Sequence, residues 1–116
     1  MKYEPLYERF EAKEPGGSAC LIEFVKSGFL TMGDQPELFF FRVGGDEAVV
    51  GISGDALRRF ERDRPRLSRE RKIDVAGLWL KSQWEAGRPL DSAHLLIRDG
   101  ELARLAAELG FEKIEK

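Results

Sequence analysis

Apolar and polar positions alternate from about residue 19 to residue 53, a period of two that is typical of β-strands. Turn signals divide this stretch, among them Ser27-Gly28 and Gly44-Gly45. Connections this short join antiparallel neighbours, so the pattern predicts an antiparallel meander of three to four strands. Three successive phenylalanines at 39–41 put bulk on both faces of one strand, which we expect to be central or covered on both sides.

A helical period flanks the meander on both sides. Before it, four large side chains at i, i+3, i+4 and i+7 predict a short N-terminal helix: Tyr3, Leu6, Tyr7 and Phe10. After it, two to three helices are expected, the first capped within Ser53-Gly54-Asp55, the next capped by Asp74 and the last by Asp99. Residues 94–98 form a short apolar run between turn signals, which favours a fifth strand over a helical turn.

The combined pattern predicts an α+β fold in one domain, residues 1–116, with the meander covered mainly on one face by the later helices. The core that this arrangement requires consists of one inward stripe from each later helix and two positions of the sheet. We expect these residues to be largely buried: Leu57, Phe60, Trp79, Leu80, Leu105, Leu109, Phe40 and Ile22.

The composition is that of a globular domain, with 42% hydrophobic and 34% charged residues in a chain of 116. No apolar run approaches the ~20 residues that a membrane-spanning helix needs, so we expect no membrane association. The charged N-terminal stretch carries no signal-peptide pattern, and we expect a cytoplasmic location. The abundance of Ala, Leu, Arg and Glu suggests a bacterial source.

Candidates for chemistry are few. One cysteine and one histidine exclude an intrachain disulfide and the usual zinc constellations, and we expect neither a metal nor a cofactor. Cys20 lies in an apolar strand pattern with no basic neighbour before Lys26, so we interpret it as a small buried side chain rather than a nucleophile. His94 is a candidate general base, with Asp91 or Asp99 to orient it, but no partner nucleophile is visible.

Five carboxylates occupy predicted loops or strand ends, and we attribute them to turns, helix caps and solubility rather than to Mg²⁺ or Ca²⁺: Asp34, Glu37, Asp46, Glu47 and Asp55. The sequence offers no catalytic constellation.

The charge is unevenly distributed, although the net charge is only −2. Residues 58–72, which we call the basic belt, carry eight basic and three acidic side chains, whereas residues 1–57 carry five basic and ten acidic. One interpretation is an anion or nucleic-acid contact through Arg58, Arg62, Arg66 and Arg69. The interpretation that we favour is an internal charge complement, in which the belt pairs with acids of its own chain.

Two classes of function remain. The first is a non-enzymatic binding or protein-interaction module, possibly a homodimer, because the chain has surplus aromatic surface. Its candidate interaction surface is Tyr3, Tyr7, Phe10 and Trp84. The second is a small enzyme or ligand-binding domain of unassigned reaction, with candidate residues His94, Cys20, Tyr7 and Arg42. A nucleic-acid-associated regulator using the basic belt is the alternative within the binding class.

Overall fold

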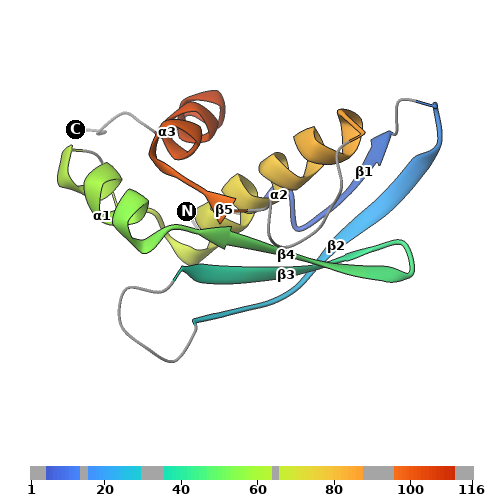
Figure 1. Cartoon of the computed structure of the whole chain (residues 1–116), viewed down its shortest axis with the longest axis horizontal. Helices are drawn as coiled ribbons and strands as arrows, with labels where there is room; N and C mark the ends of the chain where they lie inside the picture. Colours follow the sequence, from blue (N-terminus) through green and yellow to red (C-terminus); the bar gives the residue numbers. More distant parts are fainter. Residues whose placement is uncertain (1–4, 14–15, 30–35, 64–65, 88–95, 112–116) are drawn as a thin grey trace.

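The computed structural model describes residues 5–13, 16–29, 36–63, 66–87 and 96–111 (Figure 1). These residues form a five-stranded sheet and three helices, which confirms the predicted α+β class. The elements along the chain are β1 (Arg9–Lys13), β2 (Ala19–Phe29), β3 (Glu37–Val43), β4 (Asp46–Ile52), α1 (Gly54–Asp63), α2 (Arg69–Glu85), β5 (Leu96–Ile97) and α3 (Asp99–Glu108).

The strand order in the sheet is the order of the chain, β1-β2-β3-β4-β5. The first four strands pair antiparallel, so the predicted meander is confirmed, and β3 is central with β2 and β4 on either side. Gly44 takes a φ of 61° in the tight turn between the paired residues Val43 and Asp46. The predicted fifth strand is also confirmed: β5 pairs parallel with β4, which makes the sheet mixed.

The hairpin predicted at Ser27-Gly28 is wrong. The second strand continues through both residues, and Gly28 pairs with Leu38 of β3. The register shifts between Phe24 and Lys26, as in a β-bulge. Strand β2 has 11 residues and stays paired with β3 on both sides of this shift.

The predicted N-terminal helix is also wrong over the described residues, because residues 9–13 form β1 and residues 5–8 are not helical. Pairing with β2 satisfies the backbone of β1, whereas a helix this short is marginal on its own. The entering chain is held by α2: the backbone N–H of Tyr7 donates to Asp74 Oδ1 at 2.8 Å. Gly77 leaves room for this crossing, since a Cβ built there would lie 2.5 Å from Tyr7 Cβ.

The starts of the helices follow local capping chemistry. Ser53 Oγ accepts from the backbone N–H of Ala56 at the start of α1, as the sequence predicts. Ser68, not Asp74, caps α2, and its Oγ accepts from the backbone N–H of Arg71 at 3.2 Å. Asp74 lies more than one turn inside the helix and is fully buried. Its carboxylate accepts the hydrogen bond from the backbone N–H of Tyr7 instead of capping the helix.

The last helix begins at Asp99 with Arg98 in the N-cap position, so the prediction that Asp99 caps it is one residue out. Gly110 follows the helix with a φ of 78°, a conformation that glycine adopts without strain.

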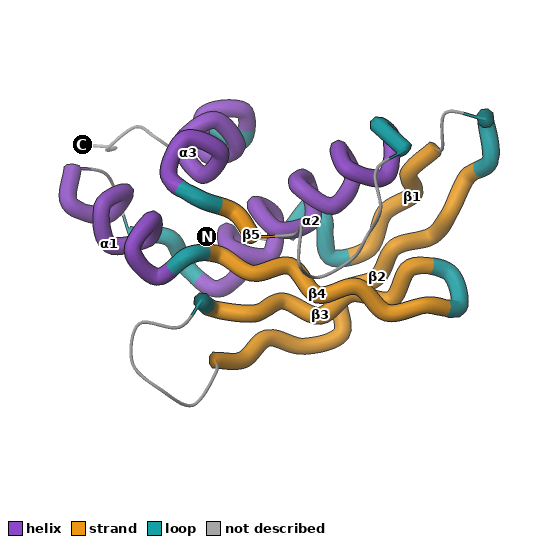
Figure 2. Tube along the Cα trace, viewed as in Figure 1, coloured by secondary structure: helices purple, strands orange, loops and turns teal. Residues whose placement is uncertain are grey.

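All three helices lie on one side of the sheet, which we call its inner face (Figures 1 and 2). The inner face contributes Ile22, Phe39, Phe41, Val50 and Ile52 to the core, each with 0% exposure. Of the residues predicted to be buried, six are: Leu57, Phe60, Trp79, Leu80, Leu105 and Ile22. The predictions for Phe40 and Leu109 are wrong, since both are half-buried. Phe40 points to the opposite face of the sheet, because its neighbours Phe39 and Phe41 occupy the inner one.

Among the described residues, no helix combines the length and the apolar character that crossing a membrane requires.

Candidate functional site

The side of the sheet turned away from the helices, its outer face, presents a row of four alternating charges. Cross-strand pairing aligns Arg9 of β1 with Glu23 of β2, Glu23 with Arg42 of β3, and Arg42 with Glu47 of β4. Each lies next to an inward-pointing residue, so alternation places all four side chains outward. We call this row the charge ladder; its signs run +, −, +, − across the sheet.

The charge ladder is accessible to solvent. Arg9 and Glu23 form an ion pair of 3.7 Å whose side chains are 71% and 37% exposed, and Arg42 and Glu47 are exposed. Opposite charges in directly facing positions stabilise a sheet by roughly 0.2–1 kcal/mol per pair. The ladder therefore contributes modestly to folding while remaining available to a partner.

Two rows of mainly apolar side chains lie beside the charge ladder on the outer face. The nearer row aligns Lys26, Phe40 and Val49, and the Lys26 ammonium lies 5.1 Å from the centre of the Phe40 ring. The farther row runs through Gly28, Leu38, Gly51 and Leu96. Four side chains of these rows are half-buried: Phe40, Val49, Leu38 and Leu96.

Two further apolar side chains of β2 are more open. Leu21 is 37% exposed, and Val25, at the register shift, is 47% exposed. A solvated sheet face normally carries polar side chains, so this density of apolar groups is unusual for an antiparallel sheet. The outer face is thus an apolar surface bordered by a charge ladder.

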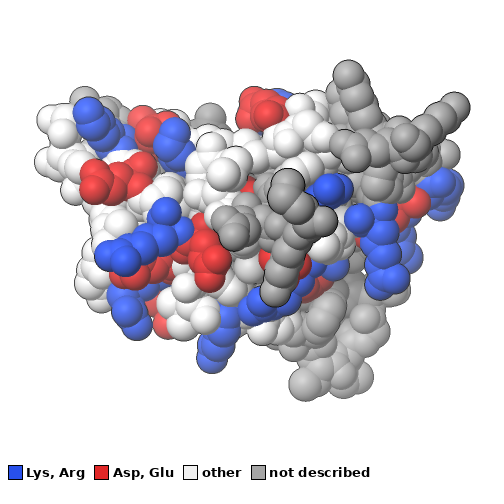
Figure 3. Space-filling view, turned by 180° about the vertical axis from the view of Figure 1, so that it is seen from behind, with Lys and Arg blue, Asp and Glu red and all other residues white. Residues whose placement is uncertain are grey.

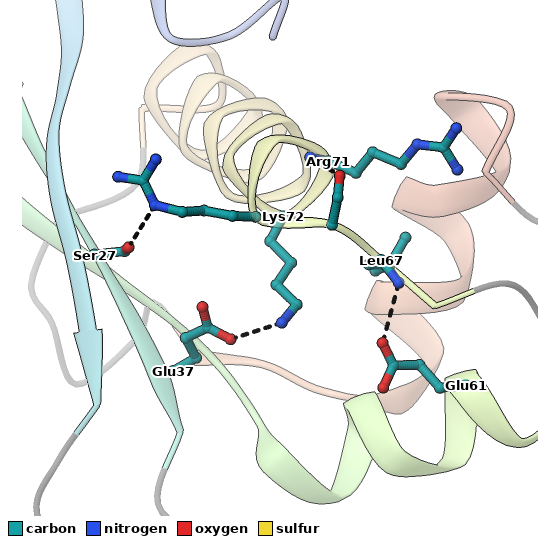
Figure 4. Close-up of polar contacts among 8 residues, drawn as sticks. Ser27, Glu37, Glu61, Leu67, Arg71 and Lys72 are labelled. Carbon is teal, nitrogen blue, oxygen red and sulfur yellow. Dashed lines mark hydrogen bonds and ion pairs between the residues drawn. The ribbon is translucent and has the colours of Figure 1, made fainter. Parts of the chain in front are cut away.

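The basic belt has a structural role at its second half, where α2 begins (Figure 4). Lys72 donates to Glu37 at 2.9 Å, and their side chains are only 16% and 8% exposed. Arg69 Nε donates to Ser27 Oγ at 3.3 Å, and its guanidinium carbon lies 5.5 Å from the centre of the Phe24 ring. These contacts tie the first turn of α2 to strands β2 and β3.

Other parts of the belt contact the helices. The guanidinium of Arg71 lies over the Phe111 ring, with 5.1 Å from its carbon to the ring centre. In Figure 4, Arg71 and Lys72 point in different directions from α2. Glu61, an acid within the belt, accepts from the backbone N–H of Leu67 at 3.0 Å and so links α1 to the connection that precedes α2.

The four arginines proposed from the sequence as an anion contact do not act alike. All four are exposed, and two of them make contacts within the chain: Arg58 pairs with Asp55, and Arg69 contacts Ser27. On the face seen in Figure 3, positive and negative side chains are interleaved rather than gathered into one large area of a single sign. Among the described residues, that face shows no one-sided display of positive charge of the kind that a nucleic-acid footprint needs.

The aromatic residues that we selected as an interaction surface pack inside the fold where the structure describes them. Tyr7 and Phe10 are half-buried and meet edge to face with 5.3 Å between ring centres. Phe10 and Trp84 pack against the core. The indole N–H of Trp84 is buried and has no hydrogen-bond partner among the described residues, so it does not point into solvent. Tyr3 lies outside the described residues.

The residues considered for chemistry are not assembled into one site. Cys20 is half-buried on the inner side of β2, where it faces Ala12, whereas Arg42 is on the outer face. His94, Asp91 and Asp34 lie outside the described residues. Within the described part of the chain, no three His, Cys, Asp or Glu side chains come together as a metal site.

Comparison of the chain with models of protein families, with curated proteins and with solved structures finds no match. The interpretation of the molecule therefore depends on its own geometry.

Proposed function

We propose that this protein is a non-enzymatic protein-interaction module that binds its partner through the outer face of the sheet. The observation that carries the proposal is the apolar surface formed there by Val25, Leu38, Phe40 and Val49, over which none of the described helices lies. Val25 is 47% exposed and the other three are half-buried, and apolar side chains that gather on a solvated face mark interaction sites on soluble proteins.

The composition of the surface supports a protein as the partner. Aromatic and arginine side chains are enriched at protein interfaces, and the outer face presents Phe40 beside Arg42 with a polar border. The proposal includes a cytoplasmic location, with which a single cysteine in the whole chain agrees. The contacts made by Arg58, Arg69, Arg71 and Lys72 favour a structural role for the basic belt over a nucleic-acid interface.

Site-specific photo-crosslinking in the native host tests the proposal. Val25→p-benzoylphenylalanine places the reactive group on the outer face, where the side chain is 47% exposed. Ala107→p-benzoylphenylalanine, at an exposed position of α3, is the matched control. We expect a discrete adduct with one polypeptide, identified by mass spectrometry, from position 25 and not from position 107. Equal labelling from both positions, or no adduct from position 25, contradicts the proposal.

A further inference from the structure

The signs of the charge ladder have a symmetry property. Read across the sheet as Arg9, Glu23, Arg42 and Glu47, they are +, −, +, −. Reversing the order of the row gives −, +, −, +, so every charge is exchanged for its opposite. A surface with this property is complementary to itself when one copy is turned end for end along the row.

We propose that the partner bound by the outer face is a second copy of this chain, related by a two-fold axis that runs parallel to the strands between β2 and β3. This inference rests on the proposed function, because it names the partner of the same surface. The axis places Arg9 of one copy opposite Glu47 of the other and Glu23 opposite Arg42, and symmetry makes each contact twice.

The charge ladder also distinguishes the two axes that bring the ladders of two copies face to face. A two-fold axis that lies across the strands and passes through the ladder leaves each ladder residue opposite its own copy, so Arg9 faces Arg9 and Glu23 faces Glu23. Like charges in contact across an interface cost several kcal/mol and exclude that arrangement. The axis parallel to the strands is therefore the one that the observed signs favour.

The apolar groups lie where this arrangement needs them. Val25 is on β2 and Phe40 on β3, the two strands that flank the axis, so Val25 of one copy approaches Phe40 of the other. Lys26, already over its own Phe40 ring, faces the same region of the partner. A desolvated aromatic group near the centre with charged pairs around it is the usual anatomy of a specific interface.

The size of the outer face sets the area that a second copy can cover. Four strands spaced by ~4.8 Å with seven residues of ~3.3 Å each give a projected area of roughly 450 Å². The relief of the side chains raises the accessible area above this value, toward the ~800 Å² per partner of a standard interface. Stacked sheets normally lie ~10 Å apart with their strands within about 30° of parallel.

Charge reversal at one end of the charge ladder is the first part of the test. The Glu47→Arg variant places like charges opposite Arg9 of the partner at two symmetric positions. We expect the dimer dissociation constant, measured by sedimentation equilibrium, to rise at least about tenfold relative to the wild type. Glu108→Arg, on exposed α3, is the matched control and should leave the dissociation constant unchanged.

Rescue by a second reversal is the decisive part. In the Arg9→Glu/Glu47→Arg variant the signs become −, −, +, +, which the same axis again pairs with their opposites. We expect dimerisation to return to within about threefold of the wild type. Within one chain the two changes are unfavourable. Arg9→Glu places a second negative charge beside Glu23, and Glu47→Arg places a second positive charge beside Arg42. The two positions are three strands apart, ~14 Å, so they do not compensate each other within one molecule.

The outcomes separate this inference from the function on which it rests. A wild-type protein that stays monomeric at ~100 µM, or a double variant that dimerises more weakly than Glu47→Arg, overturns the second copy as partner. Circular dichroism and urea unfolding confirm that each variant is folded before its dissociation constant is compared. A monomeric wild type with a discrete Val25 adduct to a different protein leaves the proposed function standing, whereas loss of the adduct overturns both.

Discussion

At the residue scale, two contacts hold the entering chain and the sheet to α2. Asp74 and Gly77 lie on the same side of that helix, and both serve the crossing of Tyr7, one as an acceptor and the other by its lack of a side chain. Lys72, on the same helix, reaches Glu37 at the start of β3. Both contacts join segments far apart in sequence, so each is a point at which one substitution affects the packing of several elements.

Gly77→Ala should destabilise the protein although alanine is the better helix former. A Cβ at this position would lie 2.8 Å from the carbonyl oxygen of Tyr7, a backbone atom that cannot rotate away. Overpacking of this kind costs about 1–3 kcal/mol, more than the ~1 kcal/mol gained in helix propensity. Gly100→Ala in α3 is the control, because nothing lies within 4 Å of its added Cβ. Urea unfolding should show a loss for the first variant and none for the second; equal effects would contradict the close crossing.

The Lys72–Glu37 ion pair should behave as a buried pair. Lys72→Met leaves the carboxylate of Glu37 without its cation in a site only 8% exposed, and we expect a loss of about 3–5 kcal/mol of unfolding free energy. Lys72→Met/Glu37→Leu removes both charges and should recover most of that loss, since an apolar pair needs no compensation. Chemical denaturation of the two variants checks this expectation, and a double variant less stable than the single one would contradict it.

At the scale of elements, the period of the apolar positions predicts most strands and helices, whereas the structure of the N-terminal segment depends on its pairing with another strand. The meander, α1, the fifth strand and the α+β class follow from the period of two, from turn glycines and from caps such as Ser53. The N-terminal stripe has a helical spacing, yet β2 offers a strand edge that pairs with residues 9–13, and this tertiary contact is not visible in the local pattern.

The interaction surface could be predicted only in part, because it depends on which residues of different strands pair with one another. The succession of Phe39, Phe40 and Phe41 indicates that one strand carries bulk on both faces, which is the signal that points to an apolar outer face. The charge ladder depends on the register of four strands, including the shift after Phe24. A one-residue error in register moves every side chain to the other face, so spacing alone does not reveal the row.

The basic belt belongs to the same scale, because its contacts join α2 to the sheet and to α1. We expect no tight binding to generic double- or single-stranded DNA or RNA in fluorescence anisotropy at ~50 mM salt, where electrostatic binding is strongest. Salt-sensitive binding that is lost in an Arg62→Ala/Arg66→Ala variant, at two exposed positions of the belt, would contradict its structural role.

At the scale of the whole molecule, the sheet separates two environments. The inner face and three helices form the core, with the buried side chains of Phe39 and Phe41 at its centre. The outer face carries the apolar rows and the charge ladder, and these have no described element over them (Figure 1). In the proposed dimer, a second copy on that face buries the sheet on both sides, which is the reason we propose for apolar groups on the outer face.

In the proposed dimer, the outer faces of two copies meet about an axis between β2 and β3. The most direct measurement is an isotope-filtered nuclear Overhauser experiment on a mixture of labelled and unlabelled wild-type protein, which reports only contacts between copies. We expect cross-peaks between the methyl groups of Val25 and the ring of Phe40 of the other copy, and none from Leu102 or Leu105, the buried side chains of α3. Intermolecular cross-peaks from the helices, or none from Val25 in a sample that sediments as a dimer, would contradict it.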